Sequence, residues 1–149
     1  MRAPLLVVPL LLLASCGDSP NRLYGSVSQV YPLDFNTVQA TLVGGEVSIE
    51  YLRTSGVKTA KVTVTISDIQ PVAGQDIDMT KLLPNGQPRG TVQRVDSGGT
   101  IDFPLQLGNI HFNQEPVANA DITGWFRTTL EDPAGRTLNG NFQAKVQAL

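Results

Sequence analysis

The sequence predicts an all-β protein, an antiparallel β-sandwich of about seven to nine short strands with an immunoglobulin-like or similar topology. Three observations support this fold class. Apolar and polar residues alternate with a period of two, turn-forming residues separate the alternating segments, and no segment sustains the apolar spacing of three and four that a helix requires. The chain of 149 residues, 41% hydrophobic and 16% charged, suits one domain with a packed core.

The segment from Ala60 to Ser67 shows the alternation most clearly. Val62 and Val64 fall on one face with Ala60, and the intervening Lys and Thr residues fall on the other face, as in a half-buried strand. The same pattern predicts strands over 38–42, 47–51, 101–107, 110–112, 122–130 and 138–146.

Turn signals lie between these segments and divide the chain into short strands. One irregular helical turn is expected over 75–83, and the lack of crossover helices favours antiparallel pairing over a parallel sheet. The expected turns are Gly44-Gly45, Ser55-Gly56, Pro84-Asn85-Gly86, Ser97-Gly98-Gly99, Gly108-Asn109 and Asp132-Pro133-Ala134-Gly135.

The last two strands permit a prediction of register, because a one-residue slip would turn their apolar faces to water. Pairing Leu130 with Leu138 places only apolar residues or glycine on the core side, and Phe142 is expected to fill the space that Gly124 leaves. The outward pairs are then Trp125 with Gln143, Arg127 with Asn141, Thr129 with Asn139 and Thr123 with Lys145.

The first fifteen residues have the three parts of a secretory signal: a basic start, a short apolar run and small residues before Cys16. The apolar run over 5–13 is too short to cross a bilayer, which takes about 20 residues.

Leu13-Ala14-Ser15-Cys16 resembles the lipobox of bacterial lipoproteins. The resemblance implies cleavage between Ser15 and Cys16, a diacylglycerol on the Cys16 thiol, and a further acyl chain such as palmitate on its amino group. We therefore expect residues 1–15 to be a signal peptide, 16–22 a lipidated cysteine and tether, and 23–149 a single β-sandwich domain. Gly17 follows the cysteine where Asp often marks inner-membrane retention, so outer membrane is favoured over inner membrane in the cell envelope.

Trp125 is the only tryptophan, and the alternation directs it outward. With Arg127, Asn141 and Gln143 it is expected to form a ligand or partner face that stacks on a sugar or anchors a protein. The alternative is that Gly124 marks a β-bulge that turns the Trp125 ring into the core, or that a loop covers the ring.

Asp76 and Asp78 are weak candidates for calcium ligands, since an extended backbone points both carboxylates the same way. No other metal and no cofactor is expected.

His111 lacks a Gly-x-Ser-x-Gly partner motif and is expected to be a solvent-facing residue. Arg89 and Arg94 are expected to be ordinary surface residues.

The sequence thus favours a non-enzymatic envelope lipoprotein, attached to the membrane through lipid on Cys16, that binds an envelope protein or a surface polysaccharide. The 13 acidic and 11 basic residues give no electrostatic reason to expect nucleic acid as a partner. Two alternatives stay open. One is a small enzyme that hydrolyses envelope carbohydrate or ester bonds with paired carboxylates, and the other is a calcium-stabilised adhesion module.

Overall fold

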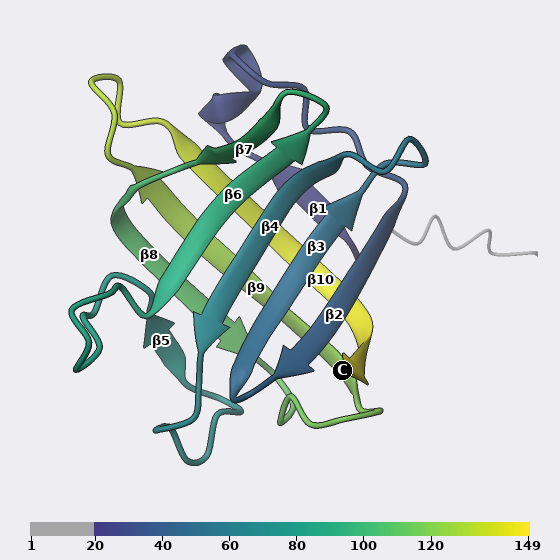
Figure 1. Cartoon of the computed structure of the whole chain (residues 1–149), viewed down its shortest axis with the longest axis vertical. Coiled ribbons are helices and arrows are strands. Elements are labelled where there is room, and N and C mark those ends of the chain that lie inside the picture. Colours follow the sequence, from purple (N-terminus) through teal and green to yellow (C-terminus); the bar gives the residue numbers. More distant parts are fainter. Residues whose placement is uncertain (1–19) are drawn as a thin grey trace, which may run out of the picture.

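The computed structural model describes residues 20–149, so the expected signal peptide and Cys16 lie outside the described residues. Within this range the chain forms a ten-stranded sheet and one short 3₁₀ helix (Figure 1). The elements are β1 (Arg22–Tyr24), η1 (Ser26–Gln29), β2 (Thr37–Val43), β3 (Glu46–Leu52), β4 (Lys58–Thr65), β5 (Asp76–Asp78), β6 (Gly90–Asp96), β7 (Gly99–Asp102), β8 (Leu105–Phe112), β9 (Asp121–Leu130) and β10 (Thr137–Ala148).

The strands form two layers whose directions cross, with β2, β3, β4 and β6 in front of β8, β9 and β10 in Figure 1. The predicted all-β, sandwich-like class is confirmed. Both layers belong to one curled sheet in the order β5-β8-β9-β10-β2-β3-β4-β6-β7. The link is β10, a strand of 12 residues whose first part pairs with β1 and whose last part pairs with β2.

One strand pair departs from the expected antiparallel pattern. Val146 to Ala148 of β10 pair in parallel with Ala40 to Leu42 of β2. A parallel pair needs no local crossover helix here, because the strands β3 to β9 lie between the two paired strands in the sequence.

Several strand limits differ from those expected. Pro104, which has no N–H for a ladder, divides the segment predicted over 101–107 into β7 and β8. The turn expected at Gly108-Asn109 is wrong, since both residues pair with β9 inside β8. The helical turn expected over 75–83 is also wrong, since β5 occupies its start.

The tether is shorter than expected. β1 begins at Arg22, and the Asn21 side-chain oxygen accepts a hydrogen bond of 2.6 Å from the backbone N–H of Gln143. Asn21 and Arg22 are therefore part of the folded domain, because they form hydrogen bonds with backbone groups at the edge of β10 that would otherwise lack a protein partner.

The core lies between the two layers and is built from the inward side chains of both. Tyr51 of β3 is fully buried, and its hydroxyl donates a hydrogen bond of 2.7 Å to the Asn141 carbonyl of β10. Burial raises the pKa of this hydroxyl well above its usual value. The bond thus connects the two layers through a neutral phenol.

The register of β9 with β10 differs by two residues from the predicted one, so the residues facing inward are unchanged. Phe126 lies opposite Gly140, and Phe142 lies opposite Gly124. A Cβ on Gly124 would lie 2.5 Å from the Phe142 ring, and a Cβ on Gly140 would lie 2.4 Å from the Phe126 ring. Each ring fills the space beside a glycine, as expected for Phe142, and this fit fixes the register.

Candidate interaction face

The outer face of β5, β8, β9, β10 and β1 carries two straight rows of side chains. Residues that pair directly across a ladder point to the same side of a sheet, so each row continues across all five strands. We call these rows, together with Gln143, the Trp125 face. The first row is Asp76, His111, Trp125, Asn141 and Arg22, and the second is Asp78, Asn109, Arg127, Asn139 and Tyr24.

Trp125 points outward, as predicted, but its ring is only half-exposed. It stacks on the His111 imidazole, with 5.4 Å between ring centroids and 5° between their planes. Gly124 makes regular pairs with both neighbouring strands, so the alternative of a bulge that turns Trp125 inward is wrong. The ring is therefore a supported part of the surface and not a free platform.

Arg127 joins the aromatic residues of the face. Its guanidinium carbon lies 5.1 Å from the centroid of the Trp125 ring and 5.5 Å from that of the Tyr24 ring. One guanidinium nitrogen donates to the Phe126 carbonyl at 2.9 Å and to the Asn141 side-chain oxygen at 3.3 Å. Cation–π contacts and hydrogen bonds together hold the Arg127 side chain over the sheet.

The β5 end of the face is acidic. Nδ1 of His111 lies 2.7 Å from Oδ1 of Asp76, and the Asp78 carboxylate accepts hydrogen bonds from the Thr80 hydroxyl and backbone N–H at 2.7 and 2.9 Å. The bonds from Thr80 lower the pKa of Asp78. Arg127 lies on the middle strand β9 and Arg22 on β1 at the opposite end, so charge changes sign across the face.

All four residues predicted for a partner face, Trp125, Arg127, Asn141 and Gln143, lie on this outer surface. Their pairing differs from the prediction because of the two-residue shift. Trp125 faces Asn141, Arg127 faces Asn139, and Gln143 faces Thr123.

The prediction missed the contribution of β1. Arg22 falls within the expected tether, and the three-residue strand carries too little alternation to be found in the sequence. Tyr24, which is 38% exposed, and Arg22, whose guanidinium lies 5.7 Å from the Tyr24 ring centroid, both extend the face. His111 was expected to face solvent alone, but it bridges Asp76 and Trp125.

The candidate metal ligands and the histidine have protein partners of their own. Asp76 and Asp78 point the same way but have separate protein partners, and residues 20–149 contain no group of three or more metal-ligating side chains. The Asp76–His111 pair has two groups of a hydrolytic triad, yet the imidazole stacks on Trp125.

The arginines expected at the surface are buried. Arg89 is 5% exposed and makes two bonds to the Asp68 carboxylate at 2.6 and 2.7 Å. Arg94, also 5% exposed, lies on the inward side of β6 over the Tyr31 ring and donates to the Pro32 carbonyl at 3.1 Å. The expectation of ordinary surface arginines is wrong, because carbonyl and carboxylate partners allow burial of both guanidinium groups.

A scan against protein-family models gives no match, and searches of curated proteins and of solved structures give none either. No helix within residues 20–149 has the length and apolar character needed to cross a bilayer.

Proposed function

We propose that this protein is a lipid-anchored lipoprotein of the cell envelope that binds an envelope protein through the Trp125 face. The observation that carries the proposal is the gathering of Trp125, Arg127 and Tyr24 on one side of the sheet. Tryptophan, tyrosine and arginine are the residues that most often dominate the energetics of protein interfaces.

The face suits a protein partner better than a sugar. Stacking on a sugar needs an open aromatic surface, whereas the Trp125 ring is half-buried and contacts His111 and Arg127. Side chains already held by their neighbours lose little conformational entropy when a partner docks. The acidic β5 end and the basic β1 end favour a partner with the opposite order of charges.

The anchor is proposed from the sequence around Cys16. Each buried CH₂ contributes about 0.8 kcal/mol to membrane binding, and stable attachment takes two or more chains. A diacylglycerol with a third chain on the amino group would meet this need. The support is the lipobox-like run Leu13-Ala14-Ser15-Cys16 after a short apolar segment.

Mass spectrometry of the protein purified from its native membrane tests the anchor. We expect a chain that starts at Cys16 and carries two or three acyl groups, and we expect Cys16→Ser to prevent the modification. An intact amino terminus, or a processed one without lipid, would refute the anchor.

Site-specific photocrosslinking in cells tests the face. A photoreactive residue at Gln143 is expected to capture a discrete envelope protein, and Trp125→Ala in the same chain is expected to abolish the adduct while the melting temperature stays near that of the parent. The matched control carries the photoreactive residue at Gln39, on the outer side of β2 in the other layer. Capture that is equal at both positions, or that persists in folded Trp125→Ala, would refute the assignment, and capture of polysaccharide would favour the sugar alternative.

A further inference from the structure

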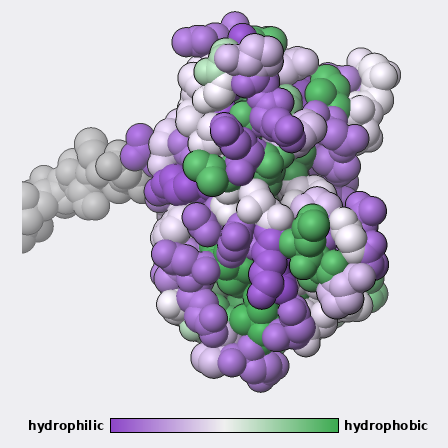
Figure 2. Space-filling view, turned by 90° about the vertical axis from the view of Figure 1, so that its left-hand side faces the viewer, coloured by the Kyte–Doolittle hydropathy of each residue, from purple (hydrophilic) through white to green (hydrophobic). Residues whose placement is uncertain are grey.

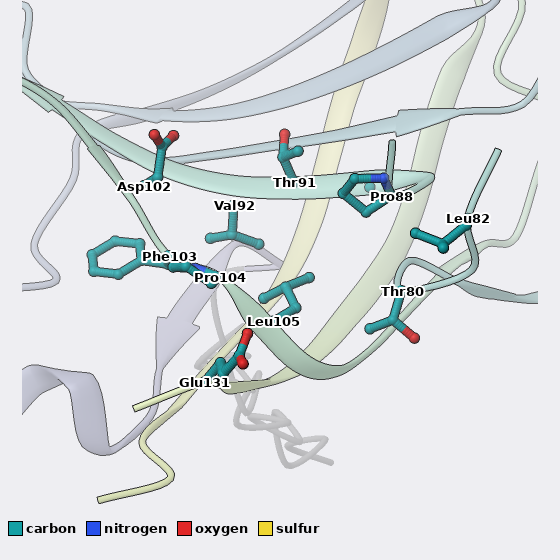
Figure 3. A pocket seen from close by; sticks show the side chains of 11 residues that line it. Thr80, Leu82, Pro88, Thr91, Val92, Asp102, Phe103, Pro104, Leu105 and Glu131 are labelled. Carbon is teal, nitrogen blue, oxygen red and sulfur yellow. The ribbon is translucent and has the colours of Figure 1, made fainter. Parts of the chain in front are cut away.

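A pocket of about 330 Å³ lies between β6, the start of β8 and the segment over 80–88 (Figure 3). It forms where the chain bends at Phe103-Pro104 on passing from β7 into β8. Figure 2 views the molecule from the side of β8 and this segment, and it shows hydrophobic residues exposed among hydrophilic ones. The pocket shares β8 with the Trp125 face, but none of its lining residues belongs to the two rows of that face.

The walls of the pocket are mainly apolar. Leu105 of β8 lines the pocket with Leu82 and Pro88 of the 80–88 segment, and Val92 of β6, which is only 1% exposed, lies behind them (Figure 3). Leu82 is 66% exposed, so a ligand in the pocket would remove apolar surface from water. Small-molecule sites are typically apolar hollows of about 300 Å³ or more with a few polar groups, and this pocket lies at the small end of that range.

Glu131 supplies the polar group. Glu131 lines the pocket, and Figure 3 shows its carboxylate near Leu105 at the start of β8, whereas the Asp102 carboxylate points away on the other side of the β6 ribbon. Asp102 is bound to the Gln93 side-chain amide at 2.7 Å. Glu131 is exposed, and its carboxylate has no hydrogen bond or ion pair within the described part of the chain. The pocket lining contains no lysine or arginine.

The backbone holds Glu131 at this position. Its N–H donates a hydrogen bond of 2.7 Å to the Pro104 carbonyl, and the neighbouring Leu130 pairs with Leu105. The ladder shifts register between Leu105 and Leu107, which marks a β-bulge or irregularity at the rim of the pocket. Bulges commonly occur beside binding sites, where they redirect side chains.

We propose that this pocket binds a small primary amine, with its alkyl chain or single aromatic ring against Leu82 and Leu105 and its ammonium group on Glu131. A carboxylate accepts hydrogen bonds only, and a bond from an ammonium donor is about twice as strong as a neutral one. An anionic ligand would meet repulsion from Glu131 with no basic side chain in the lining to offset it. This assignment does not depend on the lipid anchor or on the Trp125 face.

Titrations of the isotopically labelled full chain with hexylamine, hexanol and hexanoate, followed by NMR, test the proposal. Hexylamine is expected to shift the backbone amides of Val92, Leu105 and Glu131 in a saturable way, with affinity about tenfold or more above that of hexanol. Hexanoate is expected to produce no saturable shift at these residues. Equal binding of hexanoate, shifts that map elsewhere, or no saturable binding of hexylamine would overturn the proposal.

Two variants make the test specific. Glu131→Gln should reduce hexylamine affinity to that of hexanol, and Leu82→Trp, a change at an exposed position, should weaken both ligands by occupying the pocket. Glu46→Gln is the matched control, because it removes the same charge from an exposed residue of β3 that does not line this pocket. Undiminished hexylamine binding by folded Glu131→Gln would overturn the role of the carboxylate.

Discussion

At the scale of the residue, close contacts between large and small side chains define the core. The Phe142 side chain is 1% exposed, packs on Phe112 at a centroid distance of 5.6 Å, and fills the space beside Gly124. Neither Gly124 nor Gly140 has a positive φ, so their role here is to admit an aromatic ring and not to form a turn.

Phe142→Ala should therefore lower the free energy of unfolding by about 3 to 5 kcal/mol, the usual cost of truncating a buried phenylalanine. Denaturant unfolding followed by circular dichroism measures this loss. Tyr24→Ala is the control, since Tyr24 is 38% exposed and its truncation should cost about 1 kcal/mol or less. Equal losses in the two variants would contradict the packing described for Phe142.

A second prediction at this scale concerns pH. The bonds from Arg89 lower the pKa of the Asp68 carboxyl from 3.8 to about 2. A carboxyl whose pKa is lower in the folded state stabilises that state above its unfolded pKa, and this contribution disappears as the pH falls through the folded value. Asp68→Asn should thus reduce stability at neutral pH, with the difference from the parent shrinking between pH 3.8 and about 2.

Stability measured by urea unfolding at a series of pH values tests the role of Asp68. The expected effect at neutral pH is modest because the Asp68 carboxylate is exposed and solvent screens it. If the difference in stability between the parent and Asp68→Asn stays constant from neutral pH to about pH 2, titration of Asp68 does not cause that difference.

At the scale of the element, alternation in the sequence was sufficient to predict the central strands and their inward faces. β3, β4 and β9 lie where the period-two pattern predicts them, because each buries one face and exposes the other. The pattern could not predict β1 and β5, which have three residues each and owe their pairing to longer strands.

Register and burial of charge depended on contacts across the fold. The predicted register of β9 with β10 pairs Leu130 with Leu138, and the observed register is shifted by two residues. Both registers put the same residues inward, so alternation alone could not distinguish them. Likewise, Arg89 and Arg94 carry no local sign of burial, since their partners Asp68 and Pro32 are distant in the sequence. The four predicted face residues do lie on one side of the sheet, because the side that a residue faces depends only on the period-two alternation and not on the register.

The unequal lengths of the strands lead to a third prediction. β5 and β7 are the two ends of the sheet order and have three and four residues, whereas β9 and β10 pair with strands on both sides and have 10 and 12. Backbone amides of short edge strands open at lower free energy than those of central strands. Native-state hydrogen exchange should therefore be fastest in β5 and β7 and slowest in β9 and β10, and uniform protection would contradict this order.

At the scale of the whole molecule, the proposed anchor and the fold together limit how far the domain can lie from a membrane. Asn21 is fixed to β10 by its bond to Gln143, and only five chain steps separate it from Cys16. A fully extended chain spans about 3.6 Å per residue, so this stretch reaches about 18 Å at most. The β1 edge of the domain, and the Trp125 face that begins there, would then stay close to the lipid surface and favour a membrane-associated partner.

The single tryptophan makes this restriction measurable. Trp125 pairs with Asn141, which pairs with Arg22, so its strand lies two strand spacings, about 10 Å, from β1. In vesicles that carry the lipidated protein and a dansyl-labelled headgroup, we expect energy transfer from Trp125 to dansyl. A flexible Gly/Ser insertion of about 20 residues between Asp18 and Ser19 adds a mean span of about 25 Å and should reduce the transfer. Because the insertion leaves the folded domain unchanged, an equal signal from both proteins, or none from the parent, would show that the Cys16 anchor does not hold the Trp125 face near the membrane.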